Sequence, residues 1–172
     1  MKTPNIKQNP HPTKRYEITM TIEGAPGPFD SINGYVLYQV DNEECVPVQP
    51  FSGARLAQRK SIPLALTRTG NVYKGTFYGD QLQDDDYFGL GTCHWAIASA
   101  GATINVKKVV FASGIGLKEI KTQKPYATYF ANASYHDPKD QGGDPGDIGT
   151  PYILQHPNEF FSVTLVAKED TP

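Results

Sequence analysis

Residues 16–23 read Tyr-Glu-Ile-Thr-Met-Thr-Ile-Glu and alternate apolar and polar side chains at every position. Successive side chains of a β-strand point to opposite faces, so this alternation is the period of a strand with one buried face. Strands of that kind form antiparallel sheets that cover a core on one side and meet water on the other. The segment therefore indicates an antiparallel β fold.

Seven further segments have the composition of short strands, with turn residues between them. We expect these strands at residues 34–40, 61–67, 72–78, 93–98, 105–113, 126–133 and 160–168. Gly70 and Asn71 can supply the positive φ of a tight hairpin between the strands at residues 61–67 and 72–78. Pro63 cannot donate to a β-ladder, which places its strand at an edge or a bulge. Residues 41–54 contain two prolines and form a long connection.

About eight short strands without helical periodicity predict an all-β fold. We expect an antiparallel β-sandwich, immunoglobulin-like or a related Greek key, with long loops. A chain of 172 residues fits one domain. We place a single β-sandwich domain at residues 15–172 and a flexible N-terminal tether at residues 1–14. The tether is predicted because its first twelve residues are polar and include three prolines.

The two cysteines, Cys45 and Cys93, are 48 positions apart. A bond between them would close a long loop, which favours a structural disulfide and an oxidising compartment. Two free thiols are the alternative, because free buried cysteine behaves as a small apolar residue. Cys93 and Trp95 share one strand face and can point into the core together. The absence of a C-x-x-C motif disfavours redox catalysis and zinc.

The charge balance and the terminus exclude two classes of partner. The formal net charge is -2, which gives no electrostatic footprint for nucleic acid. No apolar run is long enough for a transmembrane segment, and the N-terminus lacks the hydrophobic centre of a signal peptide. The polar start is consistent with an upstream signal or lipid-anchor segment that was removed, or with a cytosolic protein that has a loose end.

An acidic turn with two aromatic residues is the first candidate site. It contains Asp84, Asp85, Asp86, Tyr87 and Phe88. Calcium loops need oxygen ligands at alternating positions, and consecutive carboxylates cannot all face one ion, so we assign no metal. A solvated loop and a contact with a basic partner surface remain, and the aromatic residues favour the partner contact.

A glycine-rich acidic loop at residues 135–149 is the second candidate. Loops of this length in compact domains are functional or disordered. Its candidate partner-binding residues are the carboxylates Asp137, Asp140, Asp144 and Asp147. Together with His136 they match no standard metal spacing, so a flexible linker and a partner contact are the alternatives. We assign no cofactor.

Sequence motifs give no support for catalysis. The chain has no G-x-S-x-G, S-x-x-K, H-E-x-x-H or phosphate-binding loop. His94 has the opposite parity to Trp95, which indicates a surface strand residue rather than a catalytic base. We therefore expect no catalytic residues and no enzyme.

The whole layout of the chain resembles the periplasmic lipoprotein immunity proteins that protect bacteria from type VI secreted lipase effectors. The resemblance lies in a small β-rich domain, a polar tether, one potential disulfide and acidic aromatic loops. It implies a periplasmic, outer-membrane-anchored protein whose precursor carries an N-terminal lipid anchor. Such a protein binds its cognate toxin, a phospholipase or lipase, and occludes its active site or its access to the membrane. Residues 84–88, with help from residues 137–147, would then engage a basic-rimmed cleft.

Two other classes of function remain open from the sequence. A cell-envelope glycan or small-ligand binding module would use Tyr87, Phe88, Tyr126 and Tyr129 as stacking platforms. A hydrolase on a β scaffold would use His94 and His136 together with the acidic loops.

Overall fold

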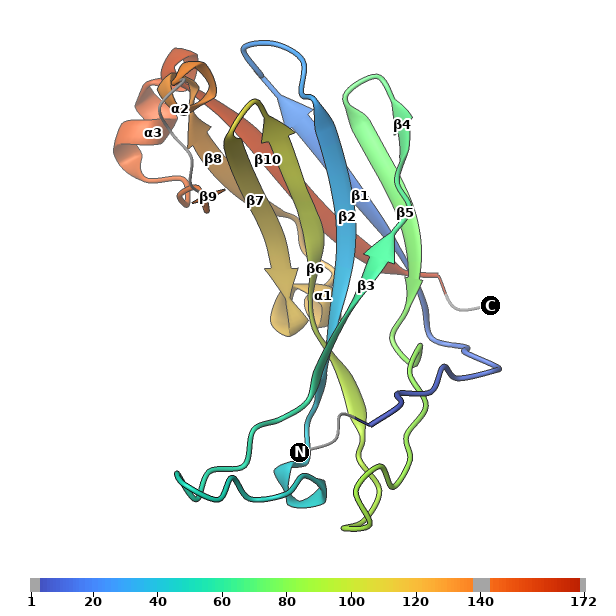
Figure 1. The fold of residues 1–172 in the computed structure, drawn as a ribbon. Coiled ribbons are helices and arrows are strands. Elements are labelled where there is room, and N and C mark those ends of the chain that lie inside the picture. Colours follow the sequence, from blue (N-terminus) through green and yellow to red (C-terminus); the bar gives the residue numbers. More distant parts are fainter. Residues whose placement is uncertain (1–3, 138–142, 171–172) are drawn as a thin grey trace.

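The chain folds into an all-β sandwich of two five-stranded sheets, as the sequence predicts (Figure 1). The computed structural model describes residues 4–137 and 143–170. The strand order is β4-β5-β1-β10-β8 in the first sheet and β3-β2-β6-β7-β9 in the second. The named strands pair antiparallel, except that β7 and β9 are parallel.

The strands have two to twelve residues, and the helical segments have three to six. The first sheet contains β4 (Thr67–Thr69), β5 (Val72–Tyr78), β1 (Arg15–Glu23), β10 (Phe160–Glu169) and β8 (Tyr126–Ala131). The second contains β3 (Arg59–Leu64), β2 (Ser31–Val40), β6 (Trp95–Val106), β7 (Val109–Gly116) and β9 (Gly143–Asp144). The helical segments are η1 (Glu43–Cys45), α1 (Leu117–Thr122), α2 (Asn132–His136), α3 (Pro151–Gln155) and η2 (Pro157–Glu159).

The core lies between the two sheets. The alternation of β1 is confirmed, because Ile18, Met20 and Ile22 are buried while the intervening side chains face outward. Three phenylalanines from both sheets meet in the centre with ring centroids 5.1 to 5.3 Å apart: Phe111, Phe130 and Phe161. Side chains of this size remove the most apolar surface from water and so contribute most to stability.

Two of the expected strands are each divided between two strands in the structure. Residues 105–113 form a hairpin, with Lys107 at φ 52° in the turn between β6 and β7. Residues 61–67 divide between the sheets, because β3 pairs with β2 and β4 pairs with β5. Pro63 lies on β3, an edge strand, as expected. Gly70 adopts φ 62° in the β4–β5 turn, again as expected.

The N-terminal segment is paired along its described part. Gln8 and Leu82 form an antiparallel bridge, and the N–H of Asn9 donates to the carbonyl of Gln81 at 2.9 Å. Farther along, the Asp80 carboxylate accepts the backbone N–H groups of Thr13 and Lys14. The pKa of Asp80 is lowered overall, because these hydrogen bonds outweigh the opposing effect of burial. The segment that we expected to be a flexible tether thus lies against residues 80–87.

Candidate functional site

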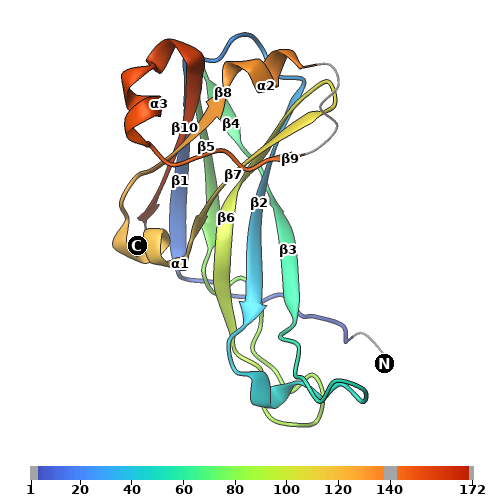
Figure 2. The same cartoon turned by 90° about the vertical axis from the view of Figure 1, so that its left-hand side faces the viewer.

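Two long loops extend beyond one end of the sandwich, at the bottom of Figures 1 and 2. They comprise residues 41–58, between β2 and β3, and residues 79–94, between β5 and β6; we call them the loop lobe. A disulfide between Cys45 and Cys93 joins them, with a Cα–Cα distance of 5.3 Å, which confirms the predicted bond. The two cysteines are buried with Val40 and Val46 in a cluster separate from the main core.

The two aromatic residues of the acidic turn cover this small cluster. Tyr87 and Phe88 are half-buried and pack against it beside Trp95. The Tyr87 hydroxyl donates to the carbonyl of Gln83 at 2.6 Å, and its ring meets Trp95 edge to face. The disulfide offers apolar surface that these rings shield from water. Phe88 is therefore part of the framework of the loop lobe rather than a freely exposed side chain at a loop tip.

The first carboxylate of the acidic turn holds the start of β6. Asp84 accepts the backbone N–H of Trp95 at 2.9 Å through one oxygen and lies 2.9 Å from Nδ1 of His94 through the other. The hydrogen bond to Asp84 raises the pKa of His94. The side chain of Asp84 is still 45% exposed, so Asp84 also adds negative charge to the surface.

The other two carboxylates also have partners within the fold. Asp85 binds the Lys7 ammonium at 2.6 Å, and this contact lowers the pKa of Asp85. Asp86 accepts the N–H groups of Gly89 and Leu90 at 2.6 and 3.1 Å, which closes the tight turn. The acidic turn thus has a structural role that the sequence pattern did not reveal.

Asn42 and Arg55 stabilise the loop lobe through side-chain hydrogen bonds to its backbone. The Asn42 amide donates to the carbonyl of Thr92 and accepts the N–H of His94, both at 2.7 Å. The Arg55 guanidinium donates to the carbonyls of Glu44 and Val46 at 2.8 and 3.1 Å. Sequence reasoning missed both residues, because a single polar side chain within a loop carries no periodic signal.

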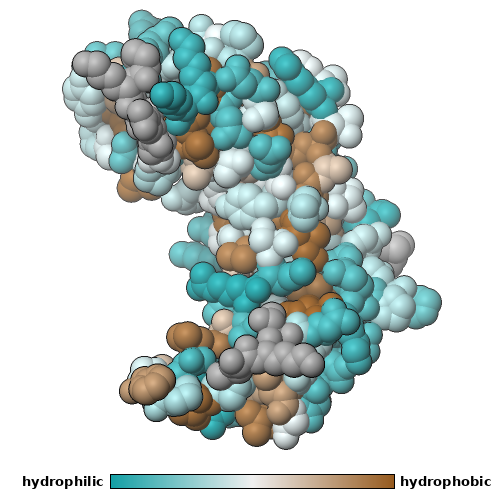
Figure 3. All heavy atoms as spheres, viewed as in Figure 1, coloured by the Kyte–Doolittle hydropathy of each residue, from teal (hydrophilic) through white to brown (hydrophobic). Residues whose placement is uncertain are grey.

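Exposed apolar side chains gather on the loop lobe. Phe51 is fully exposed, with a relative accessibility of 104%. Three other large apolar residues of the loop lobe are also exposed: Val48, Leu56 and Leu90. The space-filling view shows hydrophobic atoms at this lower end of the molecule (Figure 3). Sequence reasoning missed Phe51; its signal was an aromatic residue in the turn-forming stretch Pro-Phe-Ser-Gly.

Phe51 lies at the tip of a braced hairpin. Val48 and Arg55 form an antiparallel bridge at its base. Nearer the tip, the N–H of Gln49 donates to the carbonyl of Ala54 at 2.7 Å. The hairpin is thus held by its own backbone, by Arg55 and by the adjacent disulfide, and it presents Phe51 to solvent.

The loop lobe is strongly acidic. It contains seven of the 18 acidic residues of the chain and one of the 16 basic residues, Arg55. Glu43 and Glu44 are exposed on η1. A concentration of one charge sign around apolar side chains creates a field that attracts a basic surface.

The second candidate loop lies at the opposite end of the sandwich, where α2, β9 and α3 lie in Figures 1 and 2. Asp144 accepts the N–H of Gly146 at 2.9 Å, and the backbone of Asp147 pairs with Tyr129 of β8. Asp137 follows α2 and is exposed. Asp140 lies outside the described residues. The structure does not bring Asp137, Asp144 and Asp147 together with the acidic turn.

The residues considered for the other two classes of function are also dispersed. Tyr87 and Phe88 are half-buried in the loop lobe, whereas Tyr126 and Tyr129 lie on β8. His94 lies beside β6 at the loop lobe, and His136 lies in α2 at the other end. Neither the expected stacking platform nor a histidine pair forms from these residues.

This chain was compared with known protein families, curated proteins and solved structures. A scan against protein-family models and searches of curated proteins and of solved structures found no match. Within residues 4–137 and 143–170, no helix has the length and apolar character needed to cross a membrane. In the same ranges, no group of three His, Cys, Asp or Glu side chains is placed to hold a metal ion.

Proposed function

We propose that this protein binds a partner protein through the loop lobe and inhibits it by occlusion. The observation that carries the proposal is the full exposure of Phe51 on a hairpin that a disulfide and Arg55 brace. Aromatic side chains are enriched in the cores of interfaces, and hot-spot residues fill well-packed pockets on the partner. A hairpin that is already ordered loses little conformational entropy on binding, so more of the burial free energy appears as affinity.

The acidic residues of the loop lobe have a separate role in this proposal. Exposed charges at the edge of an interface mainly accelerate association, whereas buried apolar anchors slow dissociation. Glu43 and Glu44 are the best placed for this role, because they are exposed and directly precede the buried Cys45. The partner cleft that fits this surface has an apolar interior and a basic rim.

The partner class we propose is a secreted antibacterial toxin, a phospholipase or lipase delivered by a type VI secretion system. Enzymes that act on acyl chains have apolar clefts, and Phe51, Leu56 and Leu90 are suited to fill one. The disulfide supports an oxidising compartment, for which we propose the periplasm, with a lipid anchor on the precursor. This immunity function rests on the layout of the chain together with the exposed residues of the loop lobe.

Inhibition assays with purified phospholipase and lipase effectors of type VI secretion systems test the proposal. We expect the protein to abolish the lipase activity and Phe51→Ser to weaken inhibition by about tenfold or more, since hot-spot truncations remove over ~1.4 kcal/mol. Tyr152→Ser is the matched control, because Tyr152 is an exposed aromatic residue on α3 at the opposite end. Equal inhibition by Phe51→Ser and the wild type would reject the loop lobe as the binding surface.

A second arm separates steering from anchoring. In the double variant Glu43→Gln and Glu44→Gln we expect slower association, little change in dissociation, and a weaker dependence on salt. Binding kinetics measured at low and physiological ionic strength report both rates. A change confined to the dissociation rate would contradict the steering role. If no secreted enzyme is inhibited at all, the occlusion function itself fails.

A further inference from the structure

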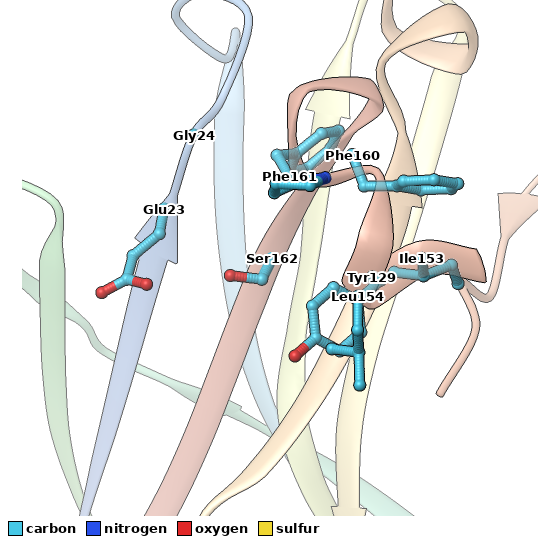
Figure 4. A pocket seen from close by; sticks show the side chains of 9 residues that line it. Glu23, Gly24, Tyr129, Ile153, Leu154, Phe160, Phe161 and Ser162 are labelled. Atoms are coloured by element: carbon cyan, nitrogen blue, oxygen red, sulfur yellow. The ribbon is translucent and has the colours of Figure 1, made fainter. Parts of the chain in front are cut away.

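A notch of about 250 Å³ lies at the end of the sandwich opposite the loop lobe. It begins on the outer face of the first sheet, where Glu23, Ser162 and Tyr129 follow one another across β1, β10 and β8. Figure 4 shows these three side chains on neighbouring strands, with Leu154 beside Tyr129. The cross-strand register thus places a carboxylate and two hydroxyl groups in one row.

The remaining wall of the notch is apolar. It is formed by residues from α3, η2 and the start of β10: Ile153, Leu154, Pro157, Phe160 and Phe161. Leu154 is 59% exposed, although an apolar side chain of this size gains free energy when it is covered. Gly24, at φ 74°, turns the chain away after β1 and puts no side chain at the edge of the notch.

The polar groups of the notch have unused hydrogen-bonding capacity. In the described part of the chain, the Glu23 carboxylate, the Ser162 hydroxyl and the Tyr129 hydroxyl have no side-chain partner. Glu23 is the only charged residue among the nine that line the notch. A carboxylate beside an apolar wall is complementary to a ligand with one cationic end and an apolar stem.

We propose that this notch binds an arginine side chain presented by a partner polypeptide. The guanidinium pairs with the Glu23 carboxylate and donates to Ser162 Oγ, because its planar fork offers five N–H donors. The aliphatic stem lies against Leu154 and Pro157, as long basic side chains bury their methylene groups on apolar surfaces. The Tyr129 ring adds a cation–π contact, which favours the flat guanidinium over a lysine ammonium. This site is independent of the loop lobe.

Peptide titrations followed by NMR test the proposal. The probes are Ac-Gly-Arg-Gly-amide, its neutral citrulline analogue and its lysine analogue. We expect the arginine peptide to shift the amide signals of Gly24, Phe161 and Ser162 in a saturable way at ~0.15 M salt. The citrulline peptide should bind at least about threefold more weakly, the effect of losing one partly exposed charge pair. Equal shifts with citrulline, or shifts spread over all acidic surfaces, would overturn the proposal.

Two variants locate the site within the notch. Glu23→Gln should weaken binding of the arginine peptide to the level of the citrulline peptide. Leu154→Ser should weaken binding of both peptides. Glu169→Gln is the control, because it makes the same chemical change on an exposed glutamate at the far end of β10. Both changed residues are exposed, so the fold is expected to persist, and the dispersion of the amide spectrum checks it. Arginine-peptide binding that survives Glu23→Gln unchanged would reject the site.

Discussion

The bond between Cys45 and Cys93 extends the pairing of β2 and β6 beyond the last residue of β2 and the first residue of β6. Their register ends at Val40 and Trp95, after which the N–H of Asp41 donates to the carbonyl of His94. The disulfide follows within a few residues and joins two loops that would otherwise be held by hydrogen bonds and the small apolar cluster around them. The loop lobe is thus a covalently closed extension of the second sheet.

Removal of the disulfide should destabilise the protein and loosen the loop lobe. The bond spans 48 positions, for which loop-closure entropy predicts a loss of about 4 kcal/mol in the free energy of unfolding. Urea unfolding of the wild type and of the double variant Cys45→Ala, Cys93→Ala measures this difference. Hydrogen exchange should rise most at residues 41–58 and 79–94. Equal unfolding midpoints would show that the bond does not constrain the unfolded chain.

Much of the fold could be predicted because its signals are local. The alternation in β1, the proline of β3 and the turn at Gly70 each report the conformation of a few neighbouring residues. The prediction of a single strand at residues 105–113 was wrong, because Val106 and Val109 are both buried, one on each side of the turn at Lys107. An unbroken apolar pattern on both sides of a turn resembles one strand.

The candidate site was predicted less well, for a physical reason. The composition of the acidic turn showed its charge but not the partners of its carboxylates. Asp85 pairs with Lys7, which is distant in sequence. Asp84 accepts a backbone N–H of β6, and a backbone group leaves no signal in the sequence. Only the fold shows which carboxylates are already engaged. The exposure of Phe51 likewise depends on the bracing of its hairpin, which the sequence does not specify.

The buried hydroxyl of Tyr38 links the two sheets. It lies on β2 and donates to the carbonyl of Tyr78, at the end of β5, at 2.5 Å; burial raises the pKa of Tyr38. Tyr38→Phe keeps the ring but removes this hydrogen bond, so we expect a loss of about 1 to 2 kcal/mol in the free energy of unfolding. Chemical denaturation measures it, with Tyr35→Phe on the outer face of the same strand as the control. A variant as stable as the wild type would show that the bond contributes nothing net.

Two glycines should respond very differently to substitution by alanine. A Cβ at Gly101, in the middle of β6, would lie 2.1 Å from the carbonyl oxygen of Ser113. The backbone must shift to relieve that overlap, and we expect Gly101→Ala to cost about 3 kcal/mol or more. Gly53 has open space around it, so Gly53→Ala should cost only the strain of φ 67°, about 1 kcal/mol. Thermal and urea unfolding rank the pair; similar losses would contradict the close approach of β6 and β7.

The ion pair of His94 and Asp84 should make the loop lobe sensitive to pH. Asp84 raises the pKa of His94 in the folded protein, so folding favours the protonated imidazole. The resulting stabilisation is complete below the unfolded pKa of about 6.5 and is lost as the pH rises through the higher folded pKa. Because both side chains are largely exposed, the effect on global stability is small, and an NMR titration of the imidazole signals is the sensitive measurement.

Asp84→Asn separates this charge effect from the structural role of Asp84. The amide oxygen can still accept the N–H of Trp95, but the negative charge beside His94 is gone. We therefore expect the titration midpoint of His94 to fall toward its ordinary value, while β6 still begins at Trp95. The amide signals at the opposite end of the sandwich serve as the internal control and should be the same in both proteins. A His94 midpoint that Asp84→Asn leaves unchanged would show that another group, such as the nearby Asp41, sets it.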